Sequence, residues 1–173
     1  MKIAGLNETA PWREAVVADF AASELFARTF EEGMELVEET AAYLDGGGRQ
    51  DAKLLSRTAA LAYAGESMRL TTRLMQIASW LLVQRAVREG EMTPDAACEA
   101  RYRIGAEGVC LGEASEETEE LPFGLLELLD RSVRLYERIR HLDRRMYLEA
   151  AGEEQAPSPV LAQFDRLKTA FGS

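Results

Sequence analysis

The 173-residue sequence has few of the residues on which enzyme active sites depend. It contains one histidine, His141, and two cysteines, Cys98 and Cys110. A single histidine excludes the HExxH zinc motif, and no P-loop, GxSxG or GxGxxG motif is present. The cysteines are too far apart for a CxxC redox or zinc pair, so we expect unpaired thiols. We therefore predict no catalytic residue, no cofactor and no metal site, and a protein that is not an enzyme.

Long apolar runs and an excess of positive charge are also missing. No run approaches the ~18 apolar residues of a membrane span, and the first residues, MKIAGLNETA, lack a signal-peptide core. We expect a cytoplasmic protein without a membrane partner. Lys and Arg total 20 against 30 Asp and Glu, a net charge of −10. Such a chain repels phosphates, so nucleic acid is not an expected partner.

Proline is absent from residues 51–89, and glycine occurs there once in the interior. This stretch is predicted to be one long helix. One line of residues recurs every seven positions and is followed, four positions later, by small side chains that permit close packing. The line is Leu54, Leu61, Met68, Met75 and Leu82. A second apolar line lies on another side of the helix: Tyr63, Leu70, Leu74, Ile77 and Leu81. Two apolar sides predict the central helix of a bundle.

Two further long helices flank the central one. The first begins near Asp19 and ends at Gly46–Gly48, and Asp51 is the expected N-cap of the central helix. Its apolar stripe is Phe26, Phe30, Gly33, Val37, Ala41 and Leu44. Pro122 begins the other helix, with an apolar line of Leu125, Leu128, Ser132, Leu135, Ile139, Leu142 and Met146. Gly33 and Gly65 are expected to mark the closest approach of the first two helices.

These elements predict an all-α fold, an antiparallel three-helix bundle. A short helix, from Thr93 to about Arg103, lies in the second connection, and a tail helix follows at the carboxyl end. Residues 93–111 should fold back over the overhanging central helix. We predict a mobile arm over residues 1–18 and a bundle domain over 19–150 with an acidic connector at 104–121. Residues 151–173 form a linker and an amphipathic segment.

One candidate partner-binding surface is the polar strip of the central helix. It contains Glu66, Arg69, Arg73, Gln76 and Gln84, with Trp80 beside it. Arginine and tryptophan often anchor protein interfaces, so Arg69, Arg73, Gln76 and Trp80 are candidate binding residues. The alternative is structural: Arg69 and Arg73 pair with acids of the first helix, and Trp80 belongs to the core.

A second candidate surface is a basic stripe on the third long helix. Arg131, Arg134 and Arg138 could recognise an acidic partner such as a receiver domain, or they could be balanced by acids nearby. The nearby acids are Glu127, Asp130, Glu137 and Asp143. His141 lies on the same stripe. Histidine phosphotransfer domains also present a histidine beside basic residues, but there a glycine follows closely and makes room for the receiver domain. No glycine follows His141 in this way.

A third candidate lies in the carboxy-terminal segment. Val160, Phe164, Leu167 and Phe171 occur at i, i+4, i+7 and i+11 after a linker that contains Pro157 and Pro159. A helix of about three turns is marginal alone in water, so this stripe needs a surface. We expect a tethered recognition helix, with Phe164, Leu167 and Phe171 as binding residues.

The run GESMRLTTRLMQIASWLLVQRAVREGEMT resembles the regulator-of-CtrA-degradation (RcdA) family. The resemblance extends through FEEGMELVEETAAYLDGGGR and LLDRSVRLYERIRHLD, and so covers most of the chain. It implies a non-enzymatic adaptor in regulated proteolysis during the cell cycle. Family members join a receiver-like priming factor, bind cargo transcriptional regulators and help deliver them to the ClpXP protease. The resemblance also suggests recruitment to a cell pole, but it supplies no motif-defined binding residues.

The composition and periodicity are compatible with a different class of protein. The alternative is a structural or dimerisation bundle, or a bundle that binds a small apolar ligand, with no link to a protease. A dry cavity along the line from Gly65 to Ser79 would favour the ligand. A homodimer is left open in either case.

Overall fold

The computed structural model describes residues 11–113 and 118–149, and every regular element in them is helical, with no strand. The elements are α1 (Pro11–Ala22), α2 (Glu24–Asp45), α3 (Gly47–Lys53), α4 (Arg57–Arg88), α5 (Pro94–Ala97), η1 (Ala100–Tyr102), α6 (Glu107–Cys110), η2 (Thr118–Glu120), α7 (Phe123–Arg144) and the π-helical turn η3 (Arg145–Glu149). The predicted all-α fold is confirmed.

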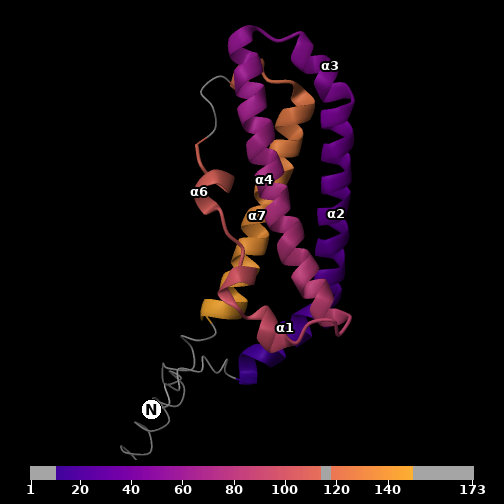
Figure 1. The fold of residues 1–173 in the computed structure, drawn as a ribbon, viewed down its shortest axis with the longest axis vertical. Helices are drawn as coiled ribbons and strands as arrows, with labels where there is room; N and C mark the ends of the chain where they lie inside the picture. The colour runs from indigo at the N-terminus through magenta and orange to yellow at the C-terminus, as the bar shows by residue number, and fades with distance from the viewer. Residues whose placement is uncertain (1–10, 114–117, 150–173) are drawn as a thin grey trace, which may run out of the picture.

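Three long helices form the body of the molecule. Figure 1 shows α2, α4 and α7 side by side. The contacts Arg73–Ser132 and Trp80–Asp143 make α4 and α7 parallel, and α2 runs antiparallel to both, so the expected alternation of three antiparallel helices is not observed. The long second connection returns the chain to the end of the bundle where α4 starts before α7 begins.

The 32 residues of α4 span about 48 Å, whereas the 22 residues of α2 and of α7 span about 33 Å. The excess length of α4 lies at its carboxyl end, where α1, α5 and η1 pack against it. The first part of residues 93–111 therefore folds back over the overhang as expected, whereas residues 107–110 pack beside the middle of α4.

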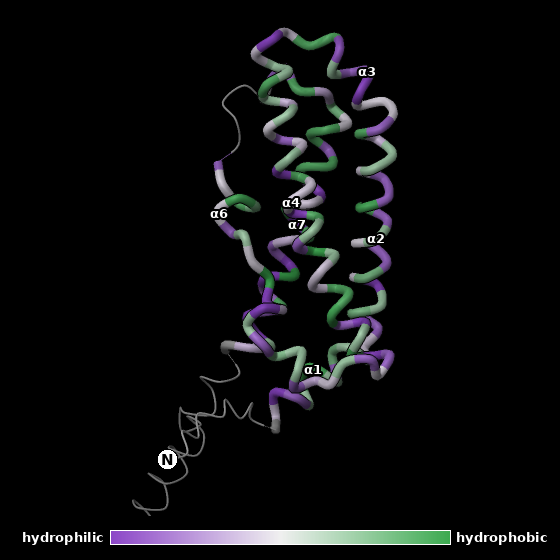
Figure 2. The backbone as a smooth tube through the Cα atoms, in the orientation of Figure 1, coloured by the Kyte–Doolittle hydropathy of each residue, from purple (hydrophilic) through white to green (hydrophobic). Residues whose placement is uncertain are grey.

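The core is formed where one apolar line of each long helix meets the others. Leu70, Ile77 and Leu81 of α4 are fully buried, as the second apolar line predicted. The apolar line of α7 is also confirmed: Leu125, Leu128, Ser132, Leu135 and Ile139 are buried, whereas Leu142 is only half-buried. In Figure 2 the hydrophobic residues of these helices recur along the tubes where the helices face one another.

The sevenfold line of α4 was assigned to the wrong face. Its members are exposed: Leu54 by 87%, Leu61 by 70%, Met68 by 73%, Met75 by 66% and Leu82 by 50%. The small-residue line that accompanies it is also largely exposed. The reason is that α4 does bury two sides, but the second buried side is its polar strip. That strip packs against the connection to α7, so the Leu/Met line remains on the surface.

The turn between α2 and α4 differs from the prediction in its length. Gly46 does end α2, but the chain then forms α3, and α4 begins only at Arg57. Its N-cap is Ser56, whose hydroxyl oxygen accepts a hydrogen bond from the amide of Ala59 at 3.1 Å, so Asp51 is not the cap. Asp51 lies within α3 and accepts a hydrogen bond from the Tyr43 hydroxyl at 3.1 Å.

The amino-terminal part of the bundle also begins earlier than expected. Residues 11–18, assigned to a mobile arm, form the first turns of α1, and Val17 and Ala21 are buried. Ser23 separates α1 from α2 as an N-cap that accepts from the Phe26 amide at 3.1 Å. A helix with two buried apolar residues is a packed element of the bundle, so α1 closes the end at which α4 stops (Figure 1).

The second connection, residues 89–122, begins as predicted. The Thr93 hydroxyl accepts from the Ala96 amide at 3.2 Å, and Pro94 occupies the first turn of α5. The expected helix to Arg103 is divided into α5 and η1. Within the acidic connector 104–121, residues 107–110 form α6, whose Cys110 is buried. Pro122 precedes α7 as predicted.

The two glycines expected to face each other do not. Gly33 is buried in α2, and an added Cβ there would lie 2.5 Å from Cδ1 of Leu81 and 3.7 Å from Cγ2 of Ile77. Gly65 is exposed, with open space where its Cβ would stand. The close approach of α2 and α4 therefore involves Gly33 and the Ile77–Leu81 turn, and the prediction for Gly65 was wrong.

These surroundings predict opposite effects for the same substitution at the two glycines. Gly65→Ala should raise the free energy of unfolding by about 0.5–1 kcal/mol, because alanine costs less backbone entropy in a helix. Gly33→Ala should lower it by roughly 1–3 kcal/mol, because the methyl group overpacks against a fully buried Leu81. Urea unfolding of the two variants provides the comparison. Equal effects would contradict the observed packing.

Candidate partner-binding surfaces

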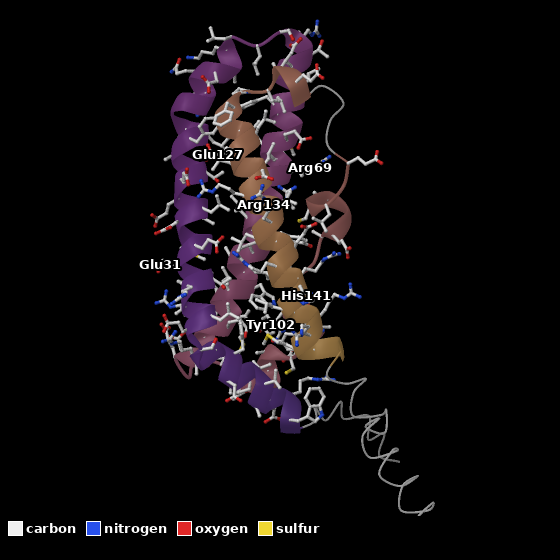
Figure 3. All side chains as sticks on the ribbon, turned by 180° about the vertical axis from the view of Figure 1, so that it is seen from behind. Glu31, Arg69, Tyr102, Glu127, Arg134 and His141 are labelled. Atoms are coloured by element: carbon white, nitrogen blue, oxygen red, sulfur yellow. The ribbon has the colours of Figure 1, made fainter. Side chains whose placement is uncertain are left out.

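The polar strip of α4 holds the second connection against the bundle. Arg69 donates to the backbone oxygens of Gly112, at 3.0 Å, and Glu113. Gln76 accepts from the Gly105 amide at 3.2 Å, and the Tyr136 hydroxyl of α7 donates to the Gly105 oxygen at 2.6 Å. Figure 3 shows Arg69 on the side of α4 that faces this connection. Side chains of both helices thus fasten the backbone of one loop.

Arg73 is the most deeply placed charge of the strip. It is 2% exposed, and its Nε and Nη2 atoms donate to the Cys110 oxygen at 2.8 and 2.6 Å. Its Nη1 atom donates to the Ser132 hydroxyl at 2.7 Å, which links α4 to α7. Burial lowers the pKa of the guanidinium below its ordinary value. Arg73 therefore joins three elements from inside the protein.

A second buried cluster lies towards the end of α4. The Trp80 indole donates to Oδ1 of Asp143 at 2.9 Å, and Arg103 donates to both carboxylate oxygens of Asp143, at 2.9 and 2.7 Å. The guanidinium of Arg103 also lies 4.3 Å from the ring centroid of Tyr147. Gln84 donates to the Tyr147 hydroxyl at 3.2 Å. One carboxylate of α7 therefore accepts from Trp80 of α4 and from Arg103, the residue that follows η1.

This geometry separates the four candidate residues of the polar strip. Trp80 and Arg73 are buried, which matches the structural alternative for Trp80. Arg69 is half-buried, and its Nη1 atom lies 3.8 Å from Oε1 of Glu66 on the same helix. The alternative expected Arg69 and Arg73 to pair with acids of α2, and no such contact is seen among the described residues. For Arg73 and Trp80 to touch a partner, the second connection would first have to leave α4. Partner binding by Arg69 and Gln76 remains a prediction.

The basic stripe of α7 is paired with two helices. Arg131 lies 2.7 Å from Glu39 of α2, and Arg138 pairs with Glu32 of α2. Arg134 lies 2.9 Å from Asp130 on α7 itself. Arg134 and the nearby His141 are exposed, as Figure 3 shows from behind. Two of the three predicted binding arginines thus already bridge α2 and α7, while Arg134 is paired only along its own helix.

The third candidate surface cannot be placed. Phe164, Leu167 and Phe171 lie outside the described residues, and their role stays a prediction.

The structure reveals an apolar groove that the sequence patterns did not predict as a surface. It lies between α2 and α4 and has a volume of about 380 Å³. Val37, Ala41 and Leu44 line it from α2, and Leu74, Met75 and Ala78 line it from α4. The sequence does contain apolar lines on both helices that include most of these residues, but both lines were assigned to the core.

The described residues also limit other functions. No group of three or more His, Cys, Asp or Glu side chains within 11–113 and 118–149 could hold a metal ion. No helix in these ranges is long and apolar enough to cross a membrane. Cys98 and Cys110 are unpaired, and burial raises the pKa of both thiols. The line from Gly65 to Ser79 is exposed and so does not enclose the cavity that would favour an internal ligand.

Comparison with known proteins places this bundle in a family. The family described as "Protein of unknown function (DUF1465)" matches residues 17–171. No curated protein matches the chain. A crystal structure of RcdA from Caulobacter crescentus CB15 is similar, with 70% sequence identity and a TM-score of 0.63. The similarity covers 76% of this chain and 98% of that chain.

The family model spans nearly all of the described bundle, so the all-α bundle of this chain is a domain of that family. With 70% identity over almost the whole of the crystallised protein, the chain belongs to the RcdA family.

The Asp143 cluster predicts a large difference between two aspartates of α7. Asp143→Ala should lower the free energy of unfolding by roughly 2–4 kcal/mol, because it leaves the buried Trp80 indole without an acceptor and the half-buried Arg103 without its anion. Asp130→Ala removes an exposed pair on the same helix and should cost less than about 1 kcal/mol. Urea unfolding at neutral pH measures both. Similar costs would mean that the cluster contributes little.

Tyr136 predicts a loss of stability at alkaline pH. Burial raises the pKa of its hydroxyl from 10.0 to about 12. Folding thus favours the protonated hydroxyl. The stabilisation that this adds to the folded state is complete below pH 10 and is lost between pH 10 and 12. Tyr136→Phe should unfold more easily at neutral pH by about 1 kcal/mol and show a shallower fall above pH 10. Urea unfolding at stepped pH values tests this. Parallel curves for both proteins would refute the assignment.

Proposed function

We propose that this protein is a non-enzymatic adaptor in regulated proteolysis. It binds cargo proteins and a receiver-like priming factor and promotes delivery of the cargo to the ClpXP protease. The observation that carries the proposal is the 70% identity to RcdA over 98% of the crystallised chain. The protease supplies ATP-driven unfolding and peptide hydrolysis, and the adaptor supplies surfaces. The cargo are transcriptional regulators of the cell cycle, and recruitment to a cell pole belongs to the same proposal.

The distribution of contacts supports a scaffold with separate binding faces. The polar strip of α4 is occupied by the second connection, so the side of α4 that remains available is the exposed Leu/Met line. Exposed methionines can adapt to several partners, because their side chains are flexible and polarisable. On the opposite side, Arg134 provides an exposed positive charge on α7 for an acidic partner. Apolar cargo contacts and an acidic receiver surface can therefore bind at different faces.

A structural or dimerisation bundle is the second candidate, and one observation favours it. Leu61, Met68, Met75 and Leu82 are exposed on one side of α4, and a homodimer could cover them. In that case the chain would associate with itself and would not change the rate of cargo degradation. Analytical ultracentrifugation combined with the degradation assay below separates the two functions.

The adaptor function predicts that cargo is degraded faster only when the chain, the priming factor, ATP and ClpXP are all present. Purified chain should accelerate degradation of a cargo regulator by ClpXP with ATP and the priming factor. The chain alone should degrade nothing, because none of its described residues forms an acid–base or nucleophile–base pair. Gel or fluorescence assays follow the cargo. Unchanged rates on addition of the chain would contradict the adaptor function.

The carboxy-terminal segment gives a sharper prediction within that assay. Deleting residues 157–173 should impair adaptor-dependent degradation while leaving the melting temperature nearly unchanged, because the bundle core lies within the described residues. Phe164→Ser with Phe171→Ser, in a chain of full length, separates loss of the apolar face from loss of tether length. A truncation that melts many degrees lower would instead identify the segment as a core helix.

A further inference from the structure

The groove between α2 and α4 has the dimensions and lining of a helix-binding site. Its walls are apolar lines at helical spacing: Val37, Ala41 and Leu44 on α2, and Leu74, Met75 and Ala78 on α4. Leu74 is buried at its floor, while Ala41 and Met75 are exposed at its edges. Two helices that present apolar edges to one groove can accept a third amphipathic helix, whose apolar side chains enter between them.

The groove also contains an unsatisfied polar group. Thr40 is 3% exposed and lines the groove, and its hydroxyl has no hydrogen-bond partner among the described residues. Buried hydroxyls are ordinarily paired. This atom therefore indicates that an occupant brings a polar group to the apolar floor.

We propose that residues 160–171 of the same chain occupy this groove as an amphipathic helix. These residues lie outside the described part of the structure, and their sequence carries the matching pattern. Val160, Phe164, Leu167 and Phe171 form one apolar stripe, which provides the side chains for the groove. Gln163 stands at the edge of that stripe and supplies a polar group of the kind that the Thr40 hydroxyl lacks.

The chain is long enough for this contact. Met75 lies 13 residues before Arg88, the last residue of α4, so the groove is roughly 20 Å from that end of the bundle. The described chain stops at Glu149, in the turn that follows α7 at the same end (Figure 1). Residues 150–159 can span at most about 36 Å when extended. Pro157 and Pro159 favour an extended linker, so the segment reaches the groove without unfolding α7.

Charge favours this occupant over a second copy of the bundle. Glu31, Glu35 and Glu38 form a row on the outward side of α2, and within the described residues no ion pair neutralises them. Two bundles meeting at this face would bring two such rows together. Residues 160–171 contain Asp165 against Arg166 and Lys168, so their side chains carry a net charge of +1. Lys168 lies next to the apolar stripe, where it can approach the carboxylates of α2.

Docking of this kind has a regulatory consequence, and in this part the inference rests on the proposed adaptor function. The groove adjoins the exposed Leu/Met line, so a docked tail covers apolar surface that cargo would use. Tethering gives the tail a high effective concentration, and a weak contact is sufficient to shield the groove until a stronger ligand displaces it. The tail then becomes available for a partner at the moment when cargo binds.

The direct test uses the isolated full-length chain labelled with ¹³C at its methionine methyl groups. In the variant Phe164→Ser/Leu167→Ser/Phe171→Ser, the Met75 resonance should move, because two aromatic rings leave the groove. Met92, outside the groove lining, should not move. The matched control, Asp165→Ser/Thr169→Ala, changes the polar side of the same segment and should leave Met75 unchanged. An unchanged Met75 in the first variant would overturn the proposal.

Hydrogen exchange provides the second arm, measured on the tail itself. Exchange in residues 160–171 should accelerate by at least about threefold in Ala41→Glu, which places a charge at the groove edge. Ala42→Glu, on the adjacent position outside the groove lining, should have no effect. Equal exchange in both variants and the parent chain would count against docking. Both arms omit protease and cargo, so a negative result here leaves the degradation assay to decide the adaptor function independently.

Protein concentration distinguishes the other occupants. A tail that docks within its own chain gives a Met75 resonance that is independent of protein concentration, whatever the oligomeric state of the bundle. A Met75 resonance that changes with concentration and persists in the Phe164/Leu167/Phe171 variant would assign the groove to a second copy. A resonance that changes only when purified cargo is added would assign it to cargo. Either result would replace the proposal.

Discussion

The arrangement of this protein depends on one buried cation. Arg73 leaves the middle of α4, donates two hydrogen bonds to the Cys110 oxygen and one to the Ser132 hydroxyl, and has almost no contact with solvent. A guanidinium taken out of water is stable only when its donors are satisfied. The second connection must therefore lie along α4, and α7 must present a hydroxyl at the correct level. Tyr136, Gln76 and the Asp143 cluster extend the same constraint along the helix.

That constraint also decides which side of α4 faces solvent. Two sides of α4 are buried. One is apolar and includes Leu70 and Ile77, and the other is polar and includes Arg73 and Gln84. The remaining side carries leucines and methionines that no described residue covers. An extensive apolar surface on a small helical protein usually marks a binding site. The hydrogen bonds of the interior thus determine which apolar residues of α4 are exposed.

Much of the fold follows from periodicity, because apolar spacing and caps report local structure directly. The line from Leu125 to Ile139 and the Thr93–Pro94 helix start were recognised for this reason. The exposed face of α4 was not, since Leu61 and Met68 have the spacing of core residues and only tertiary contacts show otherwise. Ser56 was missed as the cap of α4, because the glycines at 46–48 carry a stronger local turn signal. The role of Arg73 depends on one backbone oxygen 37 residues away, that of Cys110, which side-chain periodicity does not report.

Much of the second connection is held through its main chain. Arg69, Arg73 and Tyr136 bind the peptide oxygens of Gly105, Cys110, Gly112 and Glu113, and Gln76 binds the Gly105 amide. A main-chain oxygen is present whatever side chain the residue carries. The outward side chains of this segment can therefore change during evolution without loosening its attachment. A bundle built in this way can acquire new surface chemistry along one flank while its interior stays the same, which suits a scaffold whose binding partners diverge faster than its fold.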